Sequence, residues 1–300
     1  MKKSFTKVFA AMMLMGLTFS LAGCGGNNTP TPQPAATPAP AAAPATTPEP
    51  AAAEEVSTGG DIVVAGSTTV APVAQALADA FMASYPQYNI EVQSMGTGAG
   101  MTAAIEGVAD IGLASRNLNA DELVYLDFIT FAVDGLAVIV NEANPVENLS
   151  LEEIRQIFLG EITNWSEVGG ENAEIIVVSR ESGSGARGSF ESLADIADEV
   201  AYSLVGTGSN GVLTSVEQNV NAIGYVTFGL IAGRNVSDVS VDGVPFSGAA
   251  AIDGSYPFAI GFHMAFQSAG VSEQTQTFLH WVMSAAGQAV VEAQEYVPVA

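Results

Sequence analysis

The chain is poor in lysine, cysteine and histidine, and each shortage excludes a class of function. All three lysines, Lys2, Lys3 and Lys7, lie at the N-terminus, so the rest of the chain cannot form the lysine-containing phosphate loop of nucleotide hydrolases. Cys24 is the single cysteine, which excludes a disulfide within the chain. The two histidines have no Cys, His, Asp or Glu neighbours at metal-ligand spacing. We therefore expect no metal site and no cofactor.

Positive charge is also scarce. Beyond the N-terminal lysines, five arginines stand against 32 acidic residues, a formal charge of −27. This charge repels nucleic acid and anionic lipid, so neither is an expected partner. No G-x-S-x-G motif occurs, so a hydrolase of that kind has no visible nucleophile.

The N-terminus has the pattern of a secretion signal. An apolar run at 8–22 follows the lysines and ends in Leu21-Ala22-Gly23-Cys24; it is shorter than the roughly 20 residues of a membrane span. It resembles a bacterial lipoprotein signal, which predicts a signal peptide at 1–23 and an acylated, palmitate-bearing Cys24. The segment 24–60 is rich in Pro, Ala and Thr and predicts a semi-extended tether.

From residue 61 onward, short apolar runs alternate with helical patterns, which indicates an α/β fold. The run 62–65 is a predicted strand, and helix 71–84 follows it. The same order predicts helices at 101–107 and 188–194 after strands near 90 and at 175–180. Ser150 and Glu153 form a capping-box pattern for a helix at 151–159, and 131–140 is a predicted strand.

Three loops rich in Gly, Ser and Thr lie at these strand-to-helix junctions, with the sequences GSTT at 66–69, GTGAG at 96–100 and SGSGA at 182–186. Glycine permits close approach of the backbone, hydroxyls donate hydrogen bonds, and the first N–H groups of a helix attract an anion. Together the loops predict an oxyanion site. A further glycine motif, GTGSNG at 206–211, is interpreted as a turn into a helix at 212–220 rather than a dinucleotide site.

The arginines divide by their neighbours. Arg116, Arg180 and Arg187 lie beside the Gly/Ser loops and are predicted to bind the anion, although Arg187 has an alternative partner in Glu191 one helical turn away. Arg155 is expected to form an ion pair with a neighbouring acid, and Arg234 to lie in a surface turn. Asp134 interrupts an apolar strand, where a carboxylate needs a partner or a function; it is the candidate acceptor for the proton of a hydrogen phosphate ion.

Six ordered segments resemble the phosphate-binding lipoproteins of bacterial phosphate ABC transporters. They are VAGSTTVAPVAQALADAF, GTGAGMTAAIEGVADIGLASRNL, AVDGLAVIVN, NPVENLSLEEIRQIFLGEITNW, VVSRESGSGARGSF and NAIGYVTFG. The resemblance implies a two-lobed, periplasmic-binding-protein-like (type II) α/β fold with the ligand at the interlobe hinge. It places lobe 1 at 61–134 and 252–300, and lobe 2 at 135–251.

The resemblance also implies a phosphate-binding set. Its members are Ser67, Thr68, Thr69, Thr97, Gly98, Ser115, Arg116, Arg180, Ser184, Gly185 and Ala186, to which Asp134 is added as the candidate proton acceptor. Two departures stand out: the family usually has Thr at Ala186, and Arg-Pro where this chain has Ala259-Ile260-Gly261.

The implied function is extracytoplasmic capture of inorganic phosphate by a lipid-anchored protein of the cell membrane, which delivers it to a membrane-embedded ABC permease without chemical turnover. Three alternatives stay open at this point. They are a secreted phosphatase-like enzyme, a binding protein for another oxyanion such as sulfate or molybdate, and a sensory or adhesive lipoprotein.

Overall fold

The computed structural model describes residues 59–197 and 199–299. The predicted signal peptide at 1–23, the acylated Cys24 and nearly all of the tether at 24–60 lie outside the described residues. Within the described part of the chain, no helix is long and apolar enough to cross a membrane.

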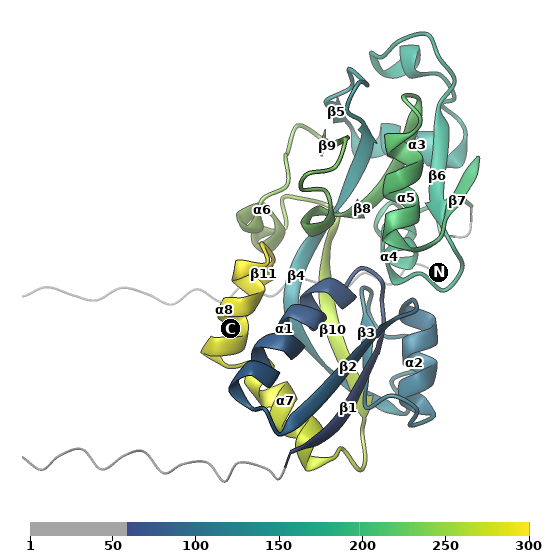
Figure 1. The fold of residues 1–300 in the computed structure, drawn as a ribbon. Coiled ribbons are helices and arrows are strands. Elements are labelled where there is room, and N and C mark those ends of the chain that lie inside the picture. Colours follow the sequence, from purple (N-terminus) through teal and green to yellow (C-terminus); the bar gives the residue numbers. More distant parts are fainter. Residues whose placement is uncertain (1–58, 198, 300) are drawn as a thin grey trace, which may run out of the picture. The chain divides into compact units, whose positions relative to one another are not determined.

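The fold begins with a parallel unit of strands and helices (Figure 1). Strand β1 pairs with both β2 and β3, and the two connecting helices are α1 and α2. Helix α1 buries Val73, Leu77 and Phe81, which recur every four residues and so share one helix face. The bounds are β1 (Gly60–Gly66), α1 (Ala71–Ser84), β2 (Tyr88–Ser94), α2 (Thr97–Ile105) and β3 (Ile111–Ala114).

Strand β4 (Leu126–Asn141) is the long connection through the middle of the fold. Its first part pairs antiparallel with β10 (Ala259–Gln267), and this pairing ends at Gly135. From Leu136 onward it pairs with β8 (Ala222–Thr227), and from Val138 with β9 (Val236–Val241) as well. The strand therefore changes partners between Gly135 and Leu136. We call the part built on β2, β1, β3, β10 and early β4 lobe 1, and the part built on late β4, β8, β6 and β7 lobe 2.

Lobe 2 repeats the order of strand, polar loop and helix. Strand β6 pairs parallel with β7 and β8. Along the chain, this part of the fold contains β5 (Asn148–Leu149), α3 (Leu151–Leu159), the short helix η1 (Trp165–Val168), β6 (Ile176–Arg180), α4 (Gly185–Leu193), β7 (Leu204–Gly206), α5 (Gly208–Glu217) and η2 (Phe228–Leu230). The chain then continues through α6 (Gly248–Asp253), β10, α7 (Glu273–Val282), α8 (Ala285–Ala293) and β11 (Val297–Pro298).

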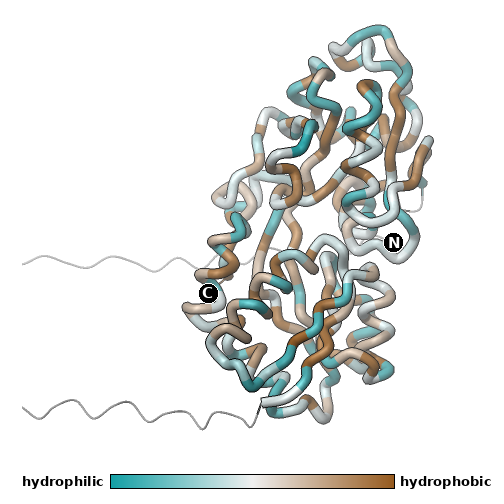
Figure 2. Tube along the Cα trace, viewed as in Figure 1, coloured by the Kyte–Doolittle hydropathy of each residue, from teal (hydrophilic) through white to brown (hydrophobic). Residues whose placement is uncertain are grey.

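Apolar residues concentrate along the strands and the helix faces that cover them (Figure 2). In lobe 1, Phe81 packs edge-to-face on Phe278 with ring centroids 5.2 Å apart. In lobe 2, Phe190 of α4 stacks on Tyr225 of β8 at 4.1 Å and on Phe258 at 5.1 Å. Offset aromatic pairs of this kind add to the stability gained from burial alone. The stack fixes α4 against the sheet, and with it the loop that precedes α4.

The mixed α/β prediction is confirmed, and the helices at 71–84 and 151–159 have the predicted bounds. Three helix starts were predicted too late. Helices α2, α4 and α5 begin at Thr97, Gly185 and Gly208 rather than at 101, 188 and 212. In each case loop glycines form part of the first turn, which has little helix propensity of its own. The Ser184 hydroxyl caps α4, whereas no side chain caps α2 or α5. The first turns of α2 and α5 are held by tertiary contacts, such as those of the Gly98 amide with Gly183 and of the Gly208 amide with Glu181. The sequence-based lobe boundaries stay predictions.

Candidate functional site

The three Gly/Ser/Thr loops lie at the starts of α1, α2 and α4, and contacts between them cross from lobe 1 to lobe 2. The Gly98 amide donates to the Gly183 carbonyl at 3.0 Å. The Ser189 hydroxyl donates to the Ser115 carbonyl at 2.9 Å. Two loops of lobe 1 and one of lobe 2 therefore form a single cluster, which we call the cradle.

The lobe 1 side of the cradle is lined by four buried polar residues, Ser67, Thr69, Thr97 and Ser115. The Ser67 hydroxyl donates to the Ser115 hydroxyl at 3.0 Å, and Ser67 also accepts from the Thr69 amide at 3.2 Å. The Ser115 amide donates to the Thr97 hydroxyl at 3.4 Å. A side chain at Gly185 would overlap the Thr97 hydroxyl oxygen. The lobe 2 backbone thus approaches these hydroxyls as closely as glycine allows.

Helix α4 brings its first turn to the cradle. Ser184 is the N-cap residue, and its hydroxyl accepts from the Arg187 amide at 3.3 Å. The first N–H groups of a helix have no partner within the helix. For α4 these include the amides of Gly185 and Ala186, both of which are buried. The backbone donor at Ala186 is therefore retained although the side chain carries no hydroxyl.

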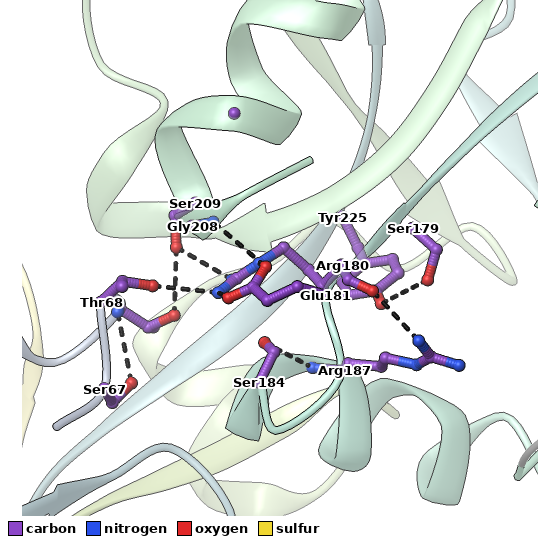
Figure 3. A network of polar contacts seen from close by, with 12 residues as sticks. Ser67, Thr68, Ser179, Arg180, Glu181, Ser184, Arg187, Gly208, Ser209 and Tyr225 are labelled. Carbon is purple, nitrogen blue, oxygen red and sulfur yellow. Dashed lines mark hydrogen bonds and ion pairs between the residues drawn. The ribbon is translucent and has the colours of Figure 1, made fainter. Parts of the chain in front are cut away.

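Arg180 is the cation of the cradle (Figure 3). Its side chain is 1% exposed. Its guanidinium donates across the lobes to the Thr68 hydroxyl at 3.0 Å, and within lobe 2 to the Ser209 hydroxyl at 3.2 Å. It also makes two bonds of 2.9 Å to the Glu181 carboxylate. A buried arginine with hydroxyls on two sides is a fixed donor for an oxyanion.

Glu181 and Ser209 are cradle residues that the sequence interpretation missed. Burial raises the pKa of the Glu181 carboxyl, but its bonds to Arg180 outweigh this and hold the pKa below its ordinary value. Glu181 also accepts from the Gly208 amide at 3.1 Å. The sequence contained a signal for each residue, since Glu181 directly follows Arg180 and Ser209 lies in GTGSNG. These signals do not show that the two residues lie close to the GSTT loop in the fold.

The other arginines are paired with carboxylates. Arg116 makes two bonds of 2.8 Å to Glu122. Arg187 donates to Glu191 at 2.6 Å, the alternative considered from the sequence, and to the Arg180 carbonyl at 3.2 Å. Both line a groove of about 730 Å³ that also includes Ser182, Gly183 and Ser184 of the SGSGA loop, so the groove adjoins the cradle. Two surface arginines are likewise paired, Arg155 with Glu152 at 3.8 Å, as expected, and Arg234 with Glu217 at 2.7 Å.

The hydrogen bonds of Asp134 do not reach the cradle loops. Its carboxylate accepts from the Gly135 amide at 2.8 Å and from the Gly229 amide at 3.4 Å. Burial raises its pKa to about 7, against the lowering effect of these two hydrogen bonds. The charge of Asp134 raises the pKa of Tyr256 and Tyr296 further, so both rings lie within its field. Asp134 thus lies where β4 changes partners, and the described contacts do not join it to an arginine.

No group of three or more potential metal ligands occurs within residues 59–197 and 199–299. His263 is buried, and burial lowers its pKa to about 4. Its Nδ1 atom lies 3.0 Å from the Thr130 hydroxyl. His263 therefore has a packing role in the lobe 1 sheet.

Comparison with known proteins agrees with this architecture. The model of the PBP superfamily domain matches residues 44–286. The phosphate-binding protein PstS of Bacillus subtilis is 31% identical over 239 residues, covering 78% of this chain and 79% of the relative. The chain belongs to the PBP superfamily, among its PstS phosphate-binding proteins. The predicted family is thereby confirmed.

Two solved structures extend the family likeness. A phosphate ABC transporter substrate-binding protein from Clostridium perfringens with bound phosphate, described as putative, is 37% identical, with a TM-score of 0.77; the match covers 80% of this chain and all of that one. An ABC-type phosphate transport receptor from Vibrio cholerae is 33% identical, with a TM-score of 0.68 and coverage of 79% and 100%. The two-lobed PBP fold predicted from the sequence is confirmed by this agreement.

Proposed function

We propose that the chain binds inorganic phosphate in the cradle and delivers it to an ABC transporter without making or breaking a bond. The observation that carries this proposal is the position of Arg180, buried between two lobes and beside three helix starts. Fixed N–H, O–H and guanidinium donors replace the water of the anion. Such local donors act at short range, which is how a protein of strongly negative charge can hold an anion. The names of the relatives point to the same ligand.

We assign ten of the predicted residues to the phosphate site. Arg116 is left out because it donates only to Glu122 and the Asn117 carbonyl, whereas Arg180 also donates to the cradle hydroxyls of Thr68 and Ser209. Asp134 is replaced as the candidate proton acceptor by Glu181, whose carboxylate is held beside Arg180 and stays ionised. An ionised carboxylate accepts the proton of hydrogen phosphate but repels sulfate. The proposed set is Ser67, Thr68, Thr69, Thr97, Gly98, Ser115, Arg180, Ser184, Gly185 and Ala186, with Glu181 as acceptor.

Calorimetric titration tests the choice of ligand. Phosphate should bind one to one at micromolar concentration, and sulfate and molybdate should give no heat there. Binding of sulfate or molybdate in place of phosphate would assign the chain to another oxyanion.

An aryl phosphate assay tests the rival phosphatase function, which predicts steady release of the aryl alcohol. We expect no turnover, because the described residues of the cradle include no histidine that could activate a nucleophile and no group of three potential metal ligands.

We further propose that Cys24 is acylated and anchors the chain to the outer face of the cell membrane, where a permease receives the phosphate. The support is the sequence pattern ending in Leu21-Ala22-Gly23-Cys24. Expression of the full chain and of Cys24→Ala in a bacterium tests the anchor. The parent should sediment with membranes and carry a palmitate label, and the variant should do neither. Equal membrane association of both would contradict lipid anchoring.

A further inference from the structure

The GTGSNG motif contributes a buried hydroxyl to the cradle. Ser209 lies in the first turn of α5 and is 3% exposed. Its oxygen is 3.2 Å from Arg180 of its own lobe and 3.2 Å from the Thr69 hydroxyl of lobe 1. Ser209 therefore joins the cation of the cradle to the start of α1 across the lobes.

One direction in this chain of contacts follows from chemistry: a guanidinium can only donate, so the Ser209 oxygen accepts from Arg180. Either hydroxyl can donate in the contact between Ser209 and Thr69. In the arrangement proposed below, the Ser209 hydroxyl donates and the Thr69 oxygen accepts. This leaves the hydrogen of Thr69 for a further acceptor. A chain of hydrogen bonds that begins at a cation strengthens the donor at its far end.

The glycines of the motif bring Ser209 into place. A side chain at Gly206 would lie 2.5 Å from the Val212 amide nitrogen, so only glycine lets α5 pack this closely on the end of β7. The Gly208 amide donates to Glu181, which fixes the first turn of α5 to the residue after Arg180. The motif is thus shaped by contacts with the cradle rather than by a turn alone.

We propose that Ser209 is a positioning residue of the phosphate site: it holds Arg180 in place and orients the Thr69 hydroxyl as a donor to the anion when the lobes are closed. This inference rests on the proposed function. It predicts that Ser209 changes phosphate affinity without itself touching phosphate, and that its effect depends on Thr69.

A double-mutant cycle tests the proposal, with phosphate affinity measured by calorimetry. Ser209→Ala should weaken binding about 10- to 100-fold, the loss expected for a hydrogen bond to a charged group. Thr69→Val removes the partner hydroxyl at similar volume. Because the two residues share one network, their effects should deviate from independence by about fivefold or more. Ser209→Thr keeps the hydroxyl and should bind phosphate with the affinity of the parent. Ser215→Ala is the matched control, since the Ser215 hydroxyl bonds within α5 to Gly211.

Thermal unfolding without phosphate separates this role from a purely structural one. Ser209→Ala leaves one buried N–H of Arg180 without its acceptor, so the variant should unfold only a few degrees below the parent and be folded at the temperature of the titration. If that variant does not fold, Ser209→Cys decides, because the thiol keeps the size but donates and accepts weakly. Affinity within twofold of the parent in a folded variant, or independent effects in the cycle, would overturn the inference. Failure of the parent itself to bind phosphate would instead overturn the proposed function.

Discussion

Gly185 of lobe 2 lies against Thr97 of lobe 1 so closely that no side chain fits between them. We expect Gly185→Ala to hold the lobes apart and to weaken phosphate binding at least about 100-fold, since the donors on the two sides could no longer reach one anion. Gly185 is at the first position of α4, where alanine is a good helix former, so the fold should be retained. Calorimetry and circular dichroism measure the two effects.

Gly188→Ala is the control for this change. Gly188 lies in the same helix, and a side chain there would meet the Arg116 side chain at an ordinary 3.5 Å. The phosphate affinity of Gly188→Ala should equal that of the parent. Equal loss in both variants would mean that α4 is disturbed generally, rather than that lobe contact at Gly185 is required.

Arg180→Ala should reduce phosphate affinity by about 100-fold or more, because it removes several charge-assisted donors from a buried site. Arg155→Ala should leave affinity unchanged, since Arg155 pairs with Glu152 on the surface of α3 at 3.8 Å. Both variants remove one positive charge, so the comparison isolates position from net charge. Similar losses in the two variants would contradict the assignment of Arg180 to the site.

Glu181 and Asp134 offer a direct comparison of two carboxylates. Glu181→Gln removes the charge beside Arg180 at nearly constant volume, so sulfate binding should rise relative to phosphate binding. Asp134→Asn should leave this ratio unchanged, because Asp134 bonds to Gly135 and Gly229 instead. Competition titrations with both anions give the ratio. A selectivity change in Asp134→Asn alone would restore Asp134 as the proton acceptor.

Asp134 should make stability depend on pH. Its folded-state pKa of about 7 lies above the ordinary pKa of 3.8 for an aspartate, so the folded chain binds the proton more tightly than the unfolded chain does. Stability should therefore fall as pH rises from about 4 to 7 and level off above this, by up to about 4 kcal/mol. Urea unfolding of the parent and of Asp134→Asn measures the free energy of unfolding of each. From pH 4 to 7 the parent should lose stability relative to Asp134→Asn. A difference that stays constant from pH 5 to 8 would contradict the raised pKa.

Local signals in the sequence predicted local structure well. The helix at 151–159 was predicted with its true bounds because Ser150 and Glu153 form a complete capping box and Gly160 adopts the left-handed conformation at its end. The start of α4 was missed because the glycines at 185 and 188 disfavour a helix. Phe190 packs on Tyr225 and Phe258 and fixes that helix through the tertiary fold.

The members of the cradle were less predictable than its loops. The sequence marks each loop by its glycines and hydroxyls, but it does not show which arginine is buried among those hydroxyls. Arg116 and Arg180 have similar neighbours in the sequence, yet Glu122 binds the first and the cradle holds the second. Asp134 meets Gly229, 95 residues further along the chain. Such partners depend on how distant elements pack, and local patterns do not record them.

A crystal structure of the chain grown with phosphate tests the central claim most directly. The account predicts one phosphate ion between the two lobes, bonded to Arg180, to the Thr68 and Thr69 hydroxyls and to the amides of Gly185 and Ala186. Phosphate bound elsewhere, for example in the groove lined by Arg116 and Arg187, with the cradle holding only protein contacts, would contradict it.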